Sequence, residues 1–448
     1  MAKKLIVLSS KELVLSFLIN QDAVYKVRVD KRGASRLVDT IFKGKVKRLA
    51  KGMEGIFVDI GLERDAFLPL KGENYKVGEG LIVQLVREPE KEKGAKLTTN
   101  VKLVGKYLVY FPRGREVKCS SKVTAEEREK LCSLIENELK EEGVILRSSA
   151  CGTEPELIKQ ELQKLRELWQ WVQKRAKVLK KPQPILEEYP SYIRLIRDNW
   201  RDLEEIVCDD AILWNYITSF LEEFEPSMLR KNLYIKDLAH YIHRYRLYES
   251  LRSIFSKVVW LRSGGYIVIE EAEACTVIDV NSGDPTGSCH EENALKTNLE
   301  AVEEIAKQII LRDIGGIILV DFIDMKKQES KNCVINALQS AFGEEACGIT
   351  IYGFTRLGIL EMVRKKTGKS ISRSLSEECP ICSGRGYMKS NAMLLLEIEK
   401  ELINSGHRVA EVCVHPLRYE RMREALPTSL QVRESYEVSV NDYSISYA

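Results

Sequence analysis

The chain has 448 residues, of which 44% are hydrophobic and 30% are charged, and its formal net charge is +3. This composition is typical of a folded protein of three or more domains, and it excludes a largely disordered chain. It allows a nucleic-acid partner only through a local basic surface. No stretch approaches the roughly 18 apolar residues of a membrane helix, and the first residues lack a signal-peptide core. We therefore expect a cytoplasmic protein without a transmembrane segment, whose eleven cysteines are mostly reduced thiols.

The first 112 residues have the pattern of short strands. Residues 1–34 alternate apolar and polar side chains, which predicts an antiparallel hairpin. Residues 35–112 contain several short strands separated by glycines, among them 41–49, 55–60 and 81–87. Strands of this length and spacing predict a small β-barrel.

An aromatic side chain lies on the polar side of one of these strands. The two-residue period of a strand places Ile56 and Val58 on one face and Phe57 on the other. Small barrels stack single-stranded bases on exposed rings of this kind, and Phe67 is a second candidate. The alternative is that Phe57 packs against a neighbouring domain and that Phe67 belongs to the core.

The rest of the chain changes character several times. Residues 124–139 and 154–180 have helical periodicity, and residues 193–260 are rich in aromatic side chains. Residues 261–375 alternate strand and helix, which predicts a predominantly parallel sheet. A knuckle of cysteines and glycines at 379–386 precedes a small α/β segment.

Two aspartates lie near the ends of apolar strands. Asp279 and Asp321 are separated by helical residues 291–312. A strand–helix–strand unit leaves its strands parallel, so neighbouring strands would place both carboxylates about 4.8 Å apart at one sheet edge. Such a pair can hold a magnesium ion, with Asn281 orienting a carboxylate or a water and Asp324 behind it. The alternative is that these aspartates only cap loops and helices.

A strand over residues 144–149 ends in an arginine and two serines. Arg147 can clamp a phosphate through two N–H groups while a serine hydroxyl binds another oxygen. The alternative is a surface arginine at a strand end. A basic run between residues 172 and 181 is either a phosphate-tracking face or a solvated helix end.

Cys379 and Cys382 form a C-x-x-C pair among glycines. Structural zinc requires four ligands, and the chain contains no second C-x-x-C pair. Either Cys413 and His415 complete the site within one chain, or two chains contribute one pair each at a dimer axis. A redox dithiol and two incidental cysteines are the remaining alternatives.

Several longer motifs resemble the ribonuclease E/G family. The resemblance runs in order along nearly the whole chain, and its central motifs are specific. The motifs are Phe57-Val58-Asp59, Glu63-Arg64, Phe67-Leu68-Pro69-Leu70, Leu97-Thr98-Thr99, Asp279-Val280-Asn281-Ser282, Thr297-Asn298-Leu299-Glu300-Ala301, Arg312-Asp313-Ile314-Gly315-Gly316-Ile317-Ile318, Asp321-Phe322-Ile323-Asp324-Met325 and the knuckle at Cys379.

The resemblance implies a magnesium-dependent endoribonuclease that hydrolyses internal bonds of single-stranded, often A/U-rich RNA and leaves 5′-phosphate ends. It also implies stimulation by a 5′-monophosphate and a role in rRNA and tRNA processing and mRNA decay. A non-catalytic S1-domain protein that binds ribosomes or messages is the main alternative, but it would have no need of the carboxylate pair. A DNA nuclease is disfavoured by the single-strand-binding barrel.

The resemblance assigns roles to individual residues. It implies Asp279 and Asp321 as magnesium ligands supported by Asn281, and Cys379 with Cys382 as half of a zinc link between two chains.

Further implied roles concern RNA. The RNA-binding residues would be Phe57, Phe67 and Lys93, and the 5′-phosphate sensor would comprise Gly105, Val109, Arg147 and Ser148. Ser148 stands where the family has threonine, so it keeps the hydroxyl. Ser121 and Lys122 stand where relatives tend to have paired arginines, and Lys122 keeps one charge for RNA contact.

The implied architecture is multidomain α/β plus β-barrel, with an RNase H-like domain interrupted by an S1 (OB-fold) barrel and a 5′-sensor region. The expected boundaries are 1–34 and 193–254 for the RNase H-like parts, 35–99 for the S1 barrel, 100–192 for the sensor, 255–375 for a DNase I-like catalytic domain, 376–388 for the zinc link and 389–448 for a small C-terminal domain. The resemblance implies a homodimer through zinc, and in some cases a tetramer. Because no long scaffold tail follows, we expect a compact member of the ribonuclease G type.

Overall fold

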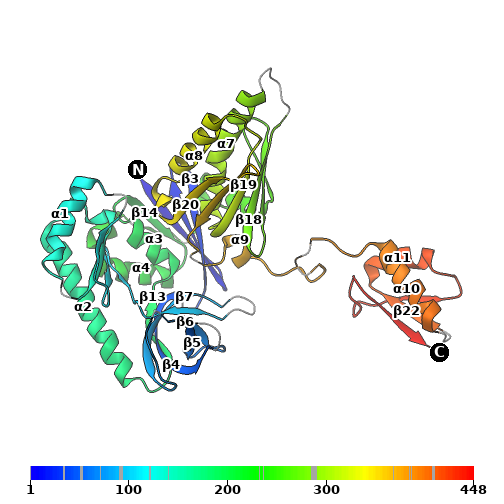
Figure 1. Ribbon diagram of the computed structural model, residues 1–448, viewed down its shortest axis with the longest axis horizontal. Coiled ribbons are helices and arrows are strands. Elements are labelled where there is room, and N and C mark those ends of the chain that lie inside the picture. Colours follow the sequence, from blue (N-terminus) through cyan, green and yellow to red (C-terminus); the bar gives the residue numbers. More distant parts are fainter. Residues whose placement is uncertain are drawn as a thin grey trace. The chain divides into compact units, whose positions relative to one another are not determined.

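The structure is a computed structural model of the chain (Figure 1). It describes all residues except 1, 34–35, 51–53, 71, 90–93, 121–122, 140, 232, 236, 284–289, 367, 383, 385, 406–408 and 448. Backbone contacts divide the chain into two units, Met1–Ser374 and Leu375–Ala448. Within the described ranges, no helix has both the length and the apolar character needed to cross a membrane.

The first sheet joins the beginning of the chain to a much later segment. Its strands are β1 (Lys3–Ser9), β2 (Leu13–Asn20), β3 (Ala23–Lys31), β14 (Leu203–Cys208) and β15 (Leu233–Tyr234), in the order β15-β14-β1-β2-β3. The antiparallel pairing of β1 with β2 confirms the predicted hairpin, and β3 extends it. Helices α3 (Ser191–Asn199) and α4 (Ala211–Phe224) contribute apolar side chains to the core of this sheet. The segments α5 (Ala239–Arg244), α6 (Leu247–Phe255) and the 3-10 turn Pro226–Lys231 follow.

Apart from residues 103–111, which pair in a different sheet, the barrel predicted for residues 35–112 is confirmed. Its strands are β4 (Arg36–Leu49), β5 (Gly55–Asp59), β6 (Ala66–Pro69), β7 (Gly80–Arg87) and β8 (Lys96–Thr98). The order is β4-β5-β6-β8-β7, and β7 pairs back to β4, so these five strands close on themselves. A later strand, β13 (Gln183–Glu188), pairs with the outer edge of β4. The barrel is consistent with an S1-like or OB-like domain.

A smaller sheet with two helices follows the barrel. Its strands are β9 (Leu103–Val104), β10 (Leu108–Phe111), β11 (Val117–Cys119) and β12 (Gly143–Leu146), and its helices are α1 (Ala125–Glu136) and α2 (Pro155–Val178). Both predicted helices are confirmed, and Thr124 caps α1 through the N–H of Glu127. The apolar stripe of α2 is buried against this sheet, as the helical period predicts. We call this sheet with its helices the α2 layer.

The third sheet corrects one expectation. Its strands are β16 (Val258–Trp260), β17 (Tyr266–Glu271), β18 (Cys275–Asn281), β19 (Gly316–Asp321), β20 (Ile349–Phe354) and β21 (Ile359–Arg364), in the order β16-β17-β18-β19-β21-β20. The predicted predominantly parallel sheet is wrong, because only β18 and β19 pair in parallel. Short turns join β16 to β17, β17 to β18 and β20 to β21, which makes antiparallel hairpins, whereas α7 (His290–Leu311) forms the crossover from β18 to its parallel neighbour β19. A second helical connection leads from β19 to β20, and β21 returns between these two strands, antiparallel to both.

Helices cover one face of this third sheet. In Figure 1, α7 and α8 (Gln328–Ala341) lie on the same side of β18 and β19. Beneath them, alternate strand residues such as Ile278, Ile318 and Leu360 are fully buried. Val277 and Ile317, which point the other way, remain exposed. The sheet therefore has one helix-covered face and one open face.

The second unit has its own small core. Its elements are α10 (Asn391–Ser405), β22 (Val409–Val414), α11 (Pro416–Ala425), β23 (Gln431–Glu434) and β24 (Tyr443–Tyr447). The sheet order is β23-β22-β24, and α10 and α11 bury Leu394 and Met422 against Val412. The small α/β segment predicted after the knuckle is confirmed. The finer domain assignment, with RNase H-like and DNase I-like parts, stays a prediction.

Candidate active site and RNA-binding surfaces

The two aspartates predicted as metal ligands lie opposite each other on neighbouring strands. Asp279 of β18 pairs in register with Asp321, the last residue of β19. Both point to the open face of the sheet, because the adjacent residues Ile278 and Val320 are buried beneath the helices. Adjacent strands lie about 4.8 Å apart, so the two carboxylates can share one ion.

The electrostatics of this pair fit a cation. Neither Asp279 nor Asp321 forms an ion pair with a basic side chain of the described residues. Partial burial raises the pKa of Asp321, and the negative charges of Asp279 and Asp324 raise it further. Asn281 donates a hydrogen bond of 2.8 Å from Nδ2 to Oδ2 of Asp279, which orients that carboxylate.

The donor set is small. In the described part of the chain, no three His, Cys, Asp or Glu side chains gather in a metal-binding arrangement. Among the described residues, an ion on the open face would therefore have these two carboxylates as ligands, with waters completing its coordination. This is the coordination that Mg²⁺ usually accepts in proteins, so the residues present fit that ion.

A buried asparagine in α7 fixes the loop that follows Asp321. Asn298 is fully buried, donates from Nδ2 to the carbonyl of Ile323 at 2.8 Å, and accepts the N–H of Ile323 at 3.0 Å. Glu291 accepts hydrogen bonds from two further backbone N–H groups of the same loop. The sequence alone did not predict this positioning role. The available signal was an asparagine within the apolar stripe of a predicted helix, where a polar side chain must find a partner.

The motif at residues 312–316 turns the end of α7 into β19. The backbone of Asp313 and of Gly316 adopts positive φ angles of 52° and 98°. The Asp313 carboxylate accepts Arg28 of β3 at 3.2 Å and Arg364 of β21 at 2.9 Å. This buried triad connects the segment before β19 to two other strands. The motif therefore stabilises the fold around the end of α7.

Two phenylalanine rings lie side by side on the barrel. Phe57 and Phe67 face each other across β5 and β6 with ring centroids 5.8 Å apart, and both are partly exposed. The guanidinium of Arg48 lies 4.0 Å from the centre of the Phe57 ring. A Cβ on Gly55 would lie 2.3 Å from the Phe67 ring, so the absence of a side chain at position 55 makes room for this ring. Rings with a cation on the surface suit stacking of single-stranded bases. Lys93, the third predicted contact, lies outside the described residues.

Arg147 and Gly105 come together at the end of β12. Arg147 donates from Nη1 to the carbonyl of Gly105 at 2.7 Å and from Nη2 to Asp198 at 2.6 Å. Burial acts to raise the pKa of Asp198, but Arg197 and Arg147 outweigh burial and lower it, so the carboxylate stays charged. Asp198 was not predicted from the sequence, since nothing in the spacing links it to Arg147.

The other predicted sensor residues flank this arginine. Ser148 is exposed directly after Arg147, and Val109 pairs with Ile145, which lies two residues before Arg147. A Cβ on Gly105 would lie 2.7 Å from the carboxylate of Glu161, so a larger residue there would have to displace this side chain. Ser121 and Lys122 lie outside the described residues.

The cysteine pair lies in the second unit. Cys379 is exposed and Cys382 is partly exposed. Cys413 donates to Glu411 at 3.7 Å, and His415 caps α11 by accepting the N–H of Leu417. These two side chains are thus engaged elsewhere, and the described residues contain no four-ligand site within one chain.

Comparison with known proteins identifies the family of this chain. A sequence model of the ribonuclease E/G family matches residues 102–367, which is more than half of the chain. The chain therefore belongs to the ribonuclease E/G family. It is similar to ribonuclease G of Haemophilus influenzae, with 33% identity over 416 residues that cover 87% of this chain and 85% of the relative. Ribonuclease G of Escherichia coli is 31% identical over 421 residues, with the same coverage of both chains. Ribonuclease E of Haemophilus influenzae is 31% identical over 98% of this chain, which spans half of that relative.

Proposed function

We propose that this protein is an endoribonuclease that hydrolyses internal phosphodiester bonds of single-stranded RNA with the help of Mg²⁺. Its family membership supports action on RNA. The observation that carries the reaction is the in-register pair of Asp279 and Asp321 on an open sheet face, without a basic partner among the described residues.

The residues of the chain would divide the work as follows. Asp279 and Asp321 would hold the ion, and Asn281 keeps the Asp279 carboxylate in one orientation. Asn298 keeps the backbone after Asp321 in place, so the distance between the two carboxylates is maintained. When bound, Mg²⁺ supplies Lewis-acid stabilisation of the charge that develops on the phosphodiester. Phe57 and Phe67 would hold bases of the substrate by stacking.

The test of this function is to incubate the protein with an internally labelled, unstructured RNA and Mg²⁺, with and without chelator, and to map the product ends. We expect internal cuts that leave 5′-phosphates and that disappear with chelator. The same RNA annealed to its complement should resist cleavage. Binding without any cleavage would instead support the S1-domain RNA-binding alternative.

We also propose that Arg147 senses a 5′-monophosphate. A phosphate would compete with Asp198 for the guanidinium, while the exposed Ser148 hydroxyl is adjacent. Arg147→Ala should weaken binding of 5′-monophosphorylated RNA about tenfold or more, because hydrogen bonds to charged groups contribute roughly 1.5–3 kcal/mol. Binding of 5′-hydroxyl RNA should not change. Fluorescence anisotropy with both RNAs measures this.

The conservative variant separates charge from geometry. Arg147→Lys keeps a positive charge but loses the two-pronged contact, so its preference should be intermediate. An alanine variant that still prefers the monophosphate as strongly as the unmodified protein would remove Arg147 from this role.

We further propose that Cys379 and Cys382 of two chains bind one zinc ion. The support is chemical, because zinc requires four ligands and no group of three or more candidate ligands gathers among the described residues of one chain. Cys379→Ser should lose bound zinc and halve the particle mass in light scattering. Cys413→Ser is the control and should retain both. The opposite result, with zinc lost only in the Cys413 variant, would indicate a site within one chain.

A further inference from the structure

A pocket separates the barrel from the α2 layer. Its volume is about 560 Å³, which is within the usual range for sites of small ligands. One wall comes from segments that follow barrel strands and includes Glu73, Thr99 and Asn100. The other wall comes from the end of β10, the turn after it, and strands β11 and β12. The site roles assigned above do not use this pocket.

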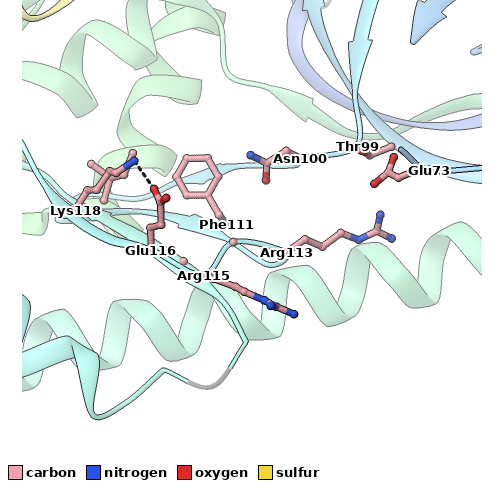
Figure 2. Close-up of a pocket in the computed structure, with 11 residues that line it drawn as sticks. Glu73, Thr99, Asn100, Phe111, Arg113, Arg115, Glu116 and Lys118 are labelled. Atoms are coloured by element: carbon pink, nitrogen blue, oxygen red, sulfur yellow. Dashed lines mark ion pairs between the residues drawn. The ribbon is translucent and has the colours of Figure 1, made fainter. Parts of the chain in front are cut away.

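The pocket combines an aromatic ring with unpaired cations. Figure 2 shows the Phe111 ring in the middle, with the side chains of Arg113 and Arg115 extending from the turn beyond it. Both arginines are exposed, and neither has an ion pair or hydrogen bond to any residue that the structure describes. On the far side of the ring, Lys118 forms an ion pair with Glu116. The two free guanidinium groups are therefore available to phosphates, and the ring is available to a base.

Two glycines form the wall behind the Phe111 ring. Phe111 pairs in register with Gly143, and a Cβ on Gly114 would lie 2.9 Å from the Cα of Gly143. The backbones of the turn and of β12 thus approach as closely as glycine allows. Ile145, which pairs with Lys118, forms the floor beside them.

The pocket and Arg147 share one face of the same sheet. Val144 and Leu146 of β12 point into the core beneath α2, so Gly143, Ile145 and Arg147 line the opposite face. Arg147 lies four positions after Gly143 in extended chain, which is about 13 Å at roughly 3.3 Å per residue. An RNA whose 5′ end lay at Arg147 would reach the pocket within a few nucleotides.

We propose that this pocket binds one nucleotide of single-stranded RNA a short distance downstream of the 5′ end, with the base on Phe111 and flanking phosphates on Arg113 and Arg115. The inference rests on the proposed function, since it takes RNA as the ligand and Arg147 as the anchor of its 5′ end. The Asn100 side chain, at the opposite wall, offers a donor and an acceptor to the base edge.

The test uses the full-length protein and 5′-monophosphorylated oligouridylates, from mononucleotide to octanucleotide, labelled at the 3′ end. Affinity is measured by fluorescence anisotropy without added divalent cation, so that the RNA is not cut. The variants are Phe111→Leu, which keeps an apolar side chain without a ring, and Arg113→Ala with Arg115→Ala. Arg421→Ala with Arg423→Ala of α11 is the control, because it also removes two exposed arginines two residues apart.

We expect the affinity of the unmodified protein to rise at one length, once the oligonucleotide reaches the pocket. Phe111→Leu should abolish this rise, with about tenfold weaker binding of the longer RNAs. The double arginine variant should also lower the slope of log Kd against log salt by about 1.4, or 0.7 for each phosphate. Binding of the mononucleotide should not change in either variant or in the control.

Three other results would overturn the inference, and they differ in what else they affect. If the unmodified protein binds none of the RNAs, the proposed function fails together with the pocket. If it binds them and the variants match it at every length, only the pocket assignment is wrong. If the arginine variant loses mononucleotide binding as well, these residues act at the 5′ end and not downstream of it. Thermal melting should show that all variants remain folded, and the exposed arginine pair provides the test should Phe111→Leu unfold.

Discussion

Replacing Asp279 or Asp321 with asparagine is expected to slow RNA cleavage by at least about 10³-fold, since the loss of the ion removes several kcal/mol of transition-state stabilisation. The two carboxylates are in register on neighbouring strands, and no basic residue of the described chain neutralises them. Asparagine has nearly the same shape but no charge, so the sheet should be preserved. Single-turnover cleavage in Mg²⁺ measures the rate, and anisotropy should show nearly unchanged RNA affinity.

A matched control lies on the same face of the same sheet. Glu361 of β21 is exposed and pairs with Leu319, so Glu361→Gln removes one negative charge from the open face without touching the aspartate pair. Its rate should stay close to that of the unmodified protein. Full activity of the Asp279 and Asp321 variants, or an equal loss in the Glu361 variant, would contradict the assignment of the ion to this pair.

Replacing Asp313 with alanine is expected to lower the free energy of unfolding by about 3–5 kcal/mol, because removal of one partner leaves buried charges uncompensated. The Asp313 side chain is only 7% exposed and accepts both Arg28 and Arg364, whose side chains are 18% and 6% exposed. Urea unfolding followed by circular dichroism measures this change. Glu270→Ala, which removes an exposed ion pair with Lys257, should cost less than about 1 kcal/mol.

The same triad predicts a pH dependence. Burial alone would raise the pKa of Asp313, but Arg28 and Arg364 outweigh burial and lower it from 3.8 to about 2. Because the folded-state pKa is depressed, the stabilisation is fully present above about pH 4 and is lost as the pH falls towards 2. The unmodified protein should therefore lose more stability across this interval than Asp313→Ala does. Equal losses in both proteins would show that the triad does not titrate as described.

Local patterns in the sequence predicted much of the fold. The barrel strands follow from apolar residues at a period of two, and the buried apolar face of α2 follows from apolar residues at a period of about four. Both patterns depend only on residues close in the sequence. The crossover between β18 and β19 also follows from a strand–helix–strand pattern, so the meeting of Asp279 and Asp321 was predictable. The direction of the other strands was not, because hairpin turns of a few residues decide it and the apolar strands look alike in either direction.

Contacts between distant segments could not be predicted in the same way. Arg147 meets Asp198, and Asp313 meets Arg28, across 51 and 285 positions of sequence. No local spacing encodes these pairs, since they depend on how the layers pack. The pocket around Phe111 is a case of the same kind, because its two walls come from separate layers. Asn298 is intermediate, since its place on an apolar stripe marked it as unusual without naming its partner.

The most direct test of the central claim is to locate the ion itself. Fe²⁺ can replace Mg²⁺, and with ascorbate and peroxide it generates hydroxyl radicals that cut the nearby backbone. If Asp279 and Asp321 share the ion, the cuts should fall in β18 near Asp279 and after β19 near Asp321, and excess Mg²⁺ should suppress them. They should also disappear in Asp279→Asn. Cuts confined to other segments, or a pattern unchanged in that variant, would contradict a shared ion at this pair.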